Sequence, residues 1–411
     1  MKIERSRGFI DLSPGEMEKF RTVEDAFREC CSKSGDREVR TPTIEYLHLF
    51  TSVGTLTPGM LKRVYSFLDW DGWSGERVVL RPDATIPVAR MYVDSLSADR
   101  LQHLFYVTNI FIFDDTGRKT RERWQCGAEL IGVNSPVADA ELVALALDVL
   151  GRLGLKDVEI RLSHAALIKT ILAGLELSRL EQEAILDKLL DGNREVLSGI
   201  KAGKPRLMQA LGLLLEMKGE SSGFLNNVRS LLPADMPELE RSFEAFAAVC
   251  RIFDGMGWKY SIDLSSGKGY EYYTGLIFHL YAGQEIIGGG GRYDDLIPMM
   301  GGDRTPAAGF ALYIDRLMAL MGKCDKTGAG AKKILLNARA DALPEALDIA
   351  GKLRNSGYTV VTGFGTEASA GFAYVLEVKS RKPGYLLTNI KTGKTASFDS
   401  DGEVMAALGC C

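Results

Sequence analysis

The alternation of apolar and polar residues is clearest in residues 104–132, LFYVTNIFIFDDTGRKTRERWQCGAELIG. This pattern predicts two strands joined by a polar, basic turn, because the DDTG run at 114–117 consists of typical hairpin-turn residues. Gln125 and Glu129 lie four residues apart on the second arm. Successive side chains of a strand point to opposite faces, so this even spacing places both side chains on one face of the predicted sheet.

Helical spacing marks the N-terminal segment and a long central stretch. Ser13 and Glu16 flank a proline in the pattern of a helix start with a capping box. From about 164 to 255, leucine, lysine and glutamate recur at helical spacing, which predicts a helical insertion. Strand patterns then return, and the glycine- and lysine-rich run 322–332 predicts a linker before a small α/β domain at 331–411.

Composition excludes several classes of protein. The 411 residues suffice for two or three domains, and contents of 46% hydrophobic and 25% charged residues are those of an ordinary globular protein. A net charge of −4 gives no strong overall attraction to nucleic acid or to anionic membranes. No apolar run reaches membrane-spanning length, and the N-terminal sequence lacks the apolar core of a signal peptide. The cytosol, with no membrane association, is therefore the expected compartment.

Cysteine and histidine usage gives no sign of a metal site. The seven cysteines include no Cys-x-x-Cys pair, and their odd number does not suggest a disulfide framework. The four histidines show no metal-ligand spacing. We therefore expect no metal and no cofactor.

Four segments occur in the order used by histidyl-tRNA synthetases, and the chain resembles that family. Residues 38–50 (EVRTPTIEYLHLF) are similar to motif 1, which forms the dimer interface, and residues 80–90 (LRPDATIPVAR) to the segment that receives the amino group of histidine. The hairpin at 104–132 resembles the motif 2 hairpin, which grips ATP. The last group resembles the two histidine-specific motifs and motif 3: KGYEYYTG (268–275), GGGGRYDDL (288–296) and GFALYIDRL (309–317). Order and spacing together carry more weight than any single motif.

The resemblance implies an α+β fold, the antiparallel sheet of class II aminoacyl-tRNA synthetases flanked by helices. It covers roughly residues 1–322, so we expect a synthetase-like core at 1–325 that contains the helical insertion at about 164–255. The small α/β domain at 331–411 occupies the place of an anticodon-binding domain, and no tRNA function is inferred for it.

The resemblance also implies a pocket for free histidine, and the residue types suit the groups of that ligand. Asp83 and Thr85 offer acceptors to the charged α-amino group. Glu129, together with Tyr272 or Tyr273, can hold the imidazole. The candidates for the α-carboxylate are Lys268, Arg121 and Gln125. Without the family order, Asp83 and Glu129 would be interpreted as surface or turn carboxylates.

Several positions depart from the synthetase pattern on the ATP side. Ile112 stands where an arginine binds the α-phosphate, although an acidic residue follows as Asp114. Tyr313 stands where a glycine lies under the adenine ring, so it should crowd a nucleotide. Lys268 replaces an arginine, and lysine cannot make the planar two-pronged contact. Arg316 matches the arginine of motif 3, with a simple structural ion pair as the alternative. Loss of the phosphate arginine removes electrostatic stabilisation, so we expect no activation of the amino acid.

Two further runs keep their alternatives open. The glycines at 288–291 lack the Lys-Ser/Thr ending of a P-loop, so we expect a close backbone approach to a small ligand or a bulged strand. Arg292 would then pair with Asp294 or Asp295. The basic cluster suits either a hairpin tip that contacts phosphate or RNA, or a solvated turn; it consists of Arg118, Lys119, Arg121 and Arg123.

These departures match one branch of the family, the ATP phosphoribosyltransferase regulatory subunits. The run RERWQCGAELIG at 121–132 is close to REFWQAGVELIG, which is typical of that branch. The resemblance implies a non-catalytic subunit in the first step of histidine biosynthesis, which binds histidine and imposes feedback inhibition on a short catalytic subunit. It further implies a homodimer within a hetero-oligomer and no tRNA charging. The alternatives are an active histidine–tRNA ligase and a stand-alone histidine-binding paralogue.

Overall fold

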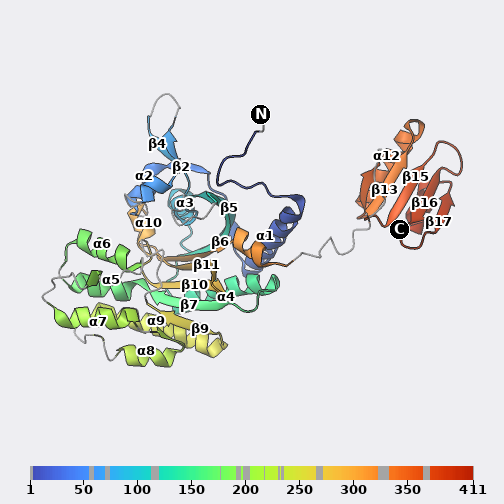
Figure 1. Cartoon of the computed structure of the whole chain (residues 1–411). Helices are drawn as coiled ribbons and strands as arrows, with labels where there is room; N and C mark the ends of the chain where they lie inside the picture. The colour runs from blue at the N-terminus through green and yellow to red at the C-terminus, as the bar shows by residue number, and fades with distance from the viewer. Residues whose placement is uncertain are drawn as a thin grey trace. The chain divides into compact units, whose positions relative to one another are not determined.

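The computed structural model describes residues 3–54, 60–69, 75–112, 120–175, 177–190, 196–197, 204–216, 218–229, 232, 236–264, 272–322, 333–363 and 371–410. Two compact units share the chain, Met1–Lys323 and Cys324–Cys411 (Figure 1). The predicted turn at 114–117 and, apart from Gly322, the predicted linker lie outside the described residues.

A nine-stranded mixed sheet forms the centre of the first unit, in the order β1-β5-β6-β12-β11-β10-β7-β9-β8. All neighbours from β5 to β7 are antiparallel, whereas β1 runs parallel to β5 and β9 parallel to β7. The expected α+β class with a largely antiparallel sheet is confirmed. The strands are β1 (Arg37–Glu38), β5 (Gln102–Phe111), β6 (Glu122–Ile131), β7 (Glu159–His164), β8 (Lys218–Gly219), β9 (Tyr260–Asp263), β10 (Leu276–Ala282), β11 (Glu285–Arg292) and β12 (Ala307–Tyr313).

Helices cover one face of this sheet and leave the other face for the site. The covering helices are α1 (Pro14–Ser34), α4 (Pro136–Arg152), α9 (Pro237–Met256) and α11 (Ile314–Leu320). The predicted start of α1 is confirmed, since Glu16 accepts the backbone N–H of Ser13 at 2.7 Å. Phe20 of α1 packs edge-on against Trp124 of β6, with ring centroids 5.1 Å apart. Trp124 lies on the covered face, and its neighbours in β6 therefore face the opposite side.

The opposite face carries a second, smaller core around α3 (Thr85–Met91), on the far side of the sheet from α4 (Figure 1). This core also includes α2 (Leu47–Ser52), η2 (Tyr92–Leu96) and α10 (Leu296–Met299). A three-stranded sheet packs beside it, with the strand order β2-β4-β3. The single turn η1 (Met60–Arg63) precedes β3 and β4 in the chain. Its strands are β2 (Ile44–Tyr46), β3 (Ser66–Leu68) and β4 (Arg77–Leu80).

Helices dominate the described part of residues 164–255, apart from the two-residue strand β8. Besides α9 they are α5 (Ala165–Gly174), α6 (Arg179–Leu190), α7 (Pro205–Glu216) and α8 (Ser222–Arg229). The second unit is a five-stranded sheet in the order β14-β13-β15-β16-β17, packed against two helices around one core. Its elements are β13 (Lys333–Ala338), η4 (Ala340–Ala342), α12 (Leu343–Asn355), β14 (Thr359–Thr362), β15 (Tyr374–Val378), β16 (Tyr385–Asn389), β17 (Thr395–Phe398) and α13 (Asp401–Ala407).

The glycine run lies in β11, a central strand with continuous pairing to β12 from Gly288 to Arg292. A Cβ at Gly290 would lie 2.1 Å from the carbonyl oxygen of Gly309. The close approach at Gly290 is therefore to a strand of the same sheet, and the expected approach to a small ligand stays a prediction. The register of β10 with β11 shifts between Leu280, which pairs with Gly288, and Tyr281, which pairs with Ile286. The register skips Ile287, directly before the glycines, which fits the bulged strand expected as the alternative.

Arg292, at the end of β11, forms a buried ion-pair network. Its guanidinium lies 3.1 Å from Asp294, which confirms one of the two expected partners. A second carboxylate, Asp139 of α4, lies closer to the guanidinium at 2.6 Å. The side chains of Arg292 and Asp139 are almost fully buried. Arg292 therefore ties α4 to the strand that leads into the site.

Among the described residues, no helix combines the length and apolarity that a bilayer crossing requires. The same residues contain no cluster of three or more histidine, cysteine, aspartate or glutamate side chains placed to hold a metal ion. The cytosolic location expected from the sequence stays a prediction.

Candidate functional site

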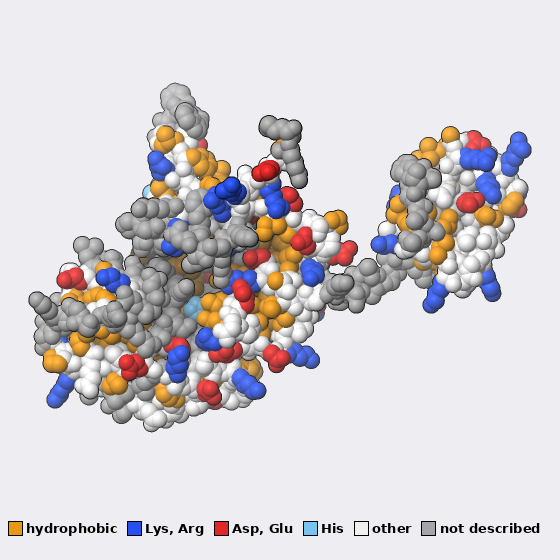
Figure 2. Space-filling view, in the orientation of Figure 1, with side chains coloured by type: hydrophobic (Ala, Val, Ile, Leu, Met, Phe, Trp, Pro, Cys, Tyr) orange, Lys and Arg blue, Asp and Glu red, His pale blue; other side chains and the backbone are white. Residues whose placement is uncertain are grey.

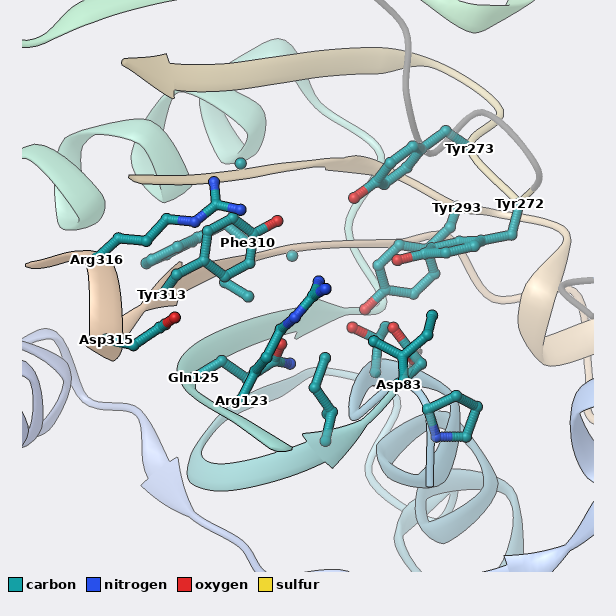
Figure 3. Close-up of a pocket in the computed structure, with 17 residues that line it drawn as sticks. Asp83, Arg123, Gln125, Tyr272, Tyr273, Tyr293, Phe310, Tyr313, Asp315 and Arg316 are labelled. Atoms are coloured by element: carbon teal, nitrogen blue, oxygen red, sulfur yellow. The ribbon is translucent and has the colours of Figure 1, made fainter. Parts of the chain in front are cut away.

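A cavity of about 210 Å³ opens on the α3 side of the large sheet (Figure 3). Its walls come from the loop before α3 and the first residue of that helix, from β5, β6, β11 and β12, from the start of α11, and from the segment before β10. Among the predicted site residues, those that line it are Asp83, Thr85, Gln125, Tyr272 and Tyr273. Arg121 and Glu129 do not line it, and Lys268 lies outside the described residues. The predicted role of each stays a prediction.

Asp83 and Thr85 reach the cavity because they stand at the start of α3. The Asp83 carboxylate accepts the backbone N–H of Ile86 at 2.8 Å, which satisfies one of the helix's free N–H groups. The Thr85 hydroxyl donates to Oε1 of Glu129 at 2.8 Å. The two side chains predicted to receive one amino group thus have different structural partners.

Glu129 lies beneath the floor of the cavity with 1% of its surface exposed. Its carboxyl accepts hydrogen bonds from Thr85 at 2.8 Å and from Tyr106 at 3.3 Å. Tyr293 donates to its other oxygen. Because Thr85 and Tyr293 line the cavity and Glu129 does not, Glu129 in this arrangement orients the groups that face a ligand.

Neither Tyr106 nor Tyr293 was predicted from the sequence, although both had a local signal. Tyr106 pairs across the strands with Gly127, where a Cβ would lie 2.4 Å from the phenol oxygen. Gly127 lies between Gln125 and Glu129 on the same strand face, so a glycine there leaves room for a large cross-strand partner. Tyr293 directly follows the glycine run and Arg292.

Burial raises the pKa of Glu129 to about 8, and the nearby Asp83 adds to the shift. The hydrogen bonds from Tyr293, Thr85 and Tyr106 oppose the shift but do not outweigh the loss of water. Burial likewise raises the pKa of Tyr106 and of Tyr293, so both phenols stay neutral donors at neutral pH. The site therefore keeps a neutral carboxyl inside a ring of hydroxyls at pH 7.

The free energy of unfolding should depend on pH because of this proton. Between pH 4.5 and 8 the folded chain retains a proton on Glu129 that the unfolded chain has released. Stability is therefore lost as the pH rises through this window, by up to about 1.4 kcal/mol per pH unit. Glu129→Gln removes the titrating group and should flatten the unfolding free energy measured in urea between pH 5 and 8. Glu18→Gln, at an exposed position of α1, is the control for the same substitution outside the site. An equally steep curve for Glu129→Gln would contradict the assignment.

Three tyrosines form the wall opposite β6. The rings of Tyr272 and Tyr273 lie 4.7 Å apart, and Tyr272 meets Tyr293 edge-on at 5.8 Å. Burial raises the pKa of Tyr272 and of Tyr273. Lys169 of α5 holds the backbone of this wall through a 2.7 Å bond to the carbonyl of Tyr273. A planar ring with polar nitrogens could stack and hydrogen-bond against such phenols.

The basic residues of the hairpin separate into two groups. Arg121 is exposed, and its guanidinium lies 3.3 Å from the hydroxyl of Tyr65. Arg123 lines the cavity, two residues before Gln125 on the same strand face. The expected basic hairpin tip is therefore corrected for Arg123, while Arg118 and Lys119 lie outside the described residues.

The side of the cavity that would face ATP contains Ile112, Tyr313 and Arg316. The guanidinium of Arg316 lies 4.7 Å from the centre of the Tyr313 ring and 3.4 Å from Glu285. Arg316 also donates to the carbonyl of Ile286. The structural ion pair offered as the alternative for Arg316 is thus present, and it holds the bulky Tyr313 at the cavity wall.

Comparison with known proteins identifies relatives along nearly the whole chain. Residues 8–317 match the family model described as histidyl-tRNA synthetase. The ATP phosphoribosyltransferase regulatory subunit of Dehalococcoides mccartyi is 50% identical over 406 residues, which cover 99% of this chain and 98% of that protein. The histidine–tRNA ligase of Methanocaldococcus jannaschii is 34% identical over 368 residues, covering 87% of this chain and 85% of the ligase.

Solved structures show the same fold at lower identity. The ATP phosphoribosyltransferase regulatory subunit/histidyl-tRNA synthetase of Bacillus halodurans superposes with a TM-score of 0.77 at 24% identity, covering 92% of this chain and 98% of that chain. The apo histidyl-tRNA synthetase of S. aureus superposes with a TM-score of 0.70 at 21% identity, covering 98% and 99% of the two chains.

Proposed function

Since the chain belongs to the family of ATP phosphoribosyltransferase regulatory subunits, a branch of the histidyl-tRNA synthetase-like proteins, we propose that it binds histidine in the cavity beside Asp83 and transmits feedback inhibition to a short catalytic subunit. The family expected from the motifs is confirmed, and so is the class II synthetase-like fold. Histidine binding and inhibition are the steps proposed beyond that membership.

The proposal rests above all on a difference between two halves of the cavity: the half that would hold the amino acid keeps its polar residues, and the half that would hold the nucleotide departs from the synthetase pattern. The amino-acid half keeps Asp83, Gln125 and the tyrosine wall, which offer a carboxylate, an amide and phenols to a zwitterion with an imidazole. The nucleotide half has an isoleucine at 112 and a tyrosine at 313. A protein with this division can hold the amino acid, but at position 112 it lacks the motif 2 arginine that would stabilise charge on a reacting phosphate.

We propose a regulatory role without catalysis, and the direct test is ATP–pyrophosphate exchange with histidine present. The expected result is no histidine-dependent exchange, because Ile112 cannot bind an α-phosphate. The S. aureus histidyl-tRNA synthetase, assayed in parallel, serves as the positive control. Exchange at an enzyme-like rate would favour the rival function, a histidine–tRNA ligase. Failure to co-purify with any short phosphoribosyltransferase subunit would favour a stand-alone histidine-binding paralogue.

We further propose a homodimer formed through the motif 1 region, within a larger complex with the catalytic subunit. Tyr46 of β2 and Phe67 of β3 flank Val78 in the register of the small sheet, on the same face as Ile44. Ile44, Tyr46 and Phe67 are each more than 40% exposed, and Figure 2 shows hydrophobic side chains grouped on this part of the molecule. An exposed apolar sheet face of this kind suits burial against a second subunit.

The division into a synthetase-like core at 1–325 and a small domain at 331–411 is part of the same proposal.

Transmission of the histidine signal requires two states of the complex that bind histidine with unequal affinity. We propose that the core holds the ligand, and we assign no RNA-binding role to the small domain.

A further inference from the structure

Arg123 is a cation inside the cavity, at a position where the motifs gave no reason to expect one. It lies on β6 directly opposite Ile110 of β5, and Gln125 follows on the same face opposite Thr108. Figure 3 shows the Arg123 side chain reaching into the cavity, between Tyr313 with Phe310 and the group of Tyr272, Tyr273 and Tyr293. The hairpin thus presents arginine from β6 and isoleucine from the β5 side, where Ile112 also lines the cavity.

The second arginine in the lining, Arg316, is committed to the protein. It is held between Glu285, the carbonyl of Ile286 and the ring of Tyr313. A guanidinium with these partners stabilises the wall, and a ligand anion would have to displace Glu285 to engage it fully. Arg123 reaches into the cavity beside Gln125, where an anionic group of a bound ligand can meet its guanidinium.

The cavity suits a ligand that carries one positively charged group and one negatively charged group. Asp83 lies at the start of α3, whereas Arg123 projects from β6, with Gln125 beside it. An α-amino acid carries one ammonium and one carboxylate on the same carbon, so a carboxylate and an arginine on two walls can hold both groups. Arginine presents a planar fork that binds a carboxylate through two parallel hydrogen bonds. A cavity of about 210 Å³ suits a ligand of this size.

We propose that Arg123 binds the α-carboxylate of histidine in this cavity, from the β6 arm of the hairpin whose β5 side carries Ile112. The contact rests on the proposed function and adds the residue that selects an amino acid over a carboxylate-free analogue. The regulatory-subunit run REFWQAGVELIG has phenylalanine at this position, so the contact distinguishes this chain from that run.

The test compares L-histidine with L-histidinol, in which a hydroxymethyl group replaces the carboxylate, by calorimetry on the full chain. The wild-type protein should bind histidine more tightly than histidinol. Arg123→Ala should weaken histidine binding tenfold or more and change histidinol binding less than threefold, because only histidine offers the carboxylate. Arg123→Lys should retain part of the preference, since it keeps the charge without the fork.

Two further variants make the result decisive. Arg123→Phe introduces the residue of the regulatory-subunit run and should lose the preference in the same way as Arg123→Ala. Arg241→Ala removes an exposed arginine of α9, whose ion pair with Glu238 spans 3.9 Å, and should leave both affinities unchanged. Histidinol binding shows in each variant that the cavity is folded.

The outcomes separate this inference from the function on which it rests. If the wild-type chain binds histidine and the Arg123 variants keep its preference over histidinol, the carboxylate contact is refuted and histidine binding stands. If the wild-type chain binds neither compound, the proposed function and the contact both fail. Loss of the preference in Arg123→Ala and Arg123→Phe, with Arg241→Ala unaffected, is the supporting result.

Discussion

Gly309→Ala should destabilise the fold and abolish histidine binding together. A Cβ at this position of β12 would lie 1.7 Å from Oε2 of Glu129 and 2.7 Å from the carbonyl oxygen of Ala128. The backbone oxygen cannot move without disturbing the pairing of β6 with β12, and hydrogen bonds hold the Glu129 carboxyl. Overpacking at such a site costs about 1–3 kcal/mol, and displacement of a buried hydrogen-bonded carboxyl adds to that cost. Urea unfolding and calorimetry with histidine measure the two effects.

A matched glycine and a double variant control this experiment. Gly212→Ala, in α7, meets nothing within 4 Å and should be neutral or stabilising by up to about 1 kcal/mol. If the clash with Glu129 is the cause, Glu129→Ala should relieve part of the damage in the Gly309→Ala background. The two substitutions would then cost less together than the sum of their separate costs. Simple additivity, or a Gly309→Ala protein that still binds histidine, would show that the site is looser than the structure indicates.

Asp83→Asn should weaken histidine binding by about 1–3 kcal/mol, roughly 5- to 150-fold, without unfolding the chain. Asparagine keeps a side-chain oxygen for the N–H of Ile86, so α3 retains its start. The substitution removes only the negative charge that we expect to face the α-ammonium group. Calorimetry with L-histidine gives the affinity, and thermal unfolding without ligand should be little changed.

Asp94→Asn is the control for Asp83→Asn. Asp94 lies in η2 after α3, pairs with Arg90 at 2.8 Å and exposes 57% of its side chain, outside the cavity. Its replacement should leave the histidine affinity unchanged. Equal affinities for wild type and Asp83→Asn would place histidine elsewhere, for example at an interface between subunits.

Local sequence patterns predicted the frame of the site well, because they reflect local geometry. The alternation in residues 104–132 predicted β5 and β6, and the even spacing of Gln125 and Glu129 matches the single strand face on which both lie. The same periodicity could have indicated Arg123, which lies on that face by the same count. Its place in a run of basic residues favoured the interpretation as a hairpin tip instead.

The sequence patterns could not predict how deeply a side chain is buried. Glu129 lies under the cavity floor only because Gly309, 180 residues later in the chain, pairs opposite it and leaves the space. The sequence predicted Asp294 or Asp295 as the partner of Arg292, while its closest carboxylate, Asp139, comes from α4. Periodicity predicts which face a residue occupies, but long-range packing decides what lies above it.

The rate of phosphoribosyl transfer by a short catalytic subunit, titrated with histidine in the presence of this chain, tests the central claim most directly. We predict that the mixture is active, that histidine inhibits it, and that Asp83→Asn raises the half-inhibiting histidine concentration roughly 5- to 150-fold. An active mixture that histidine inhibits equally with the wild-type chain and with Asp83→Asn, or does not inhibit at all, would contradict regulation through this cavity.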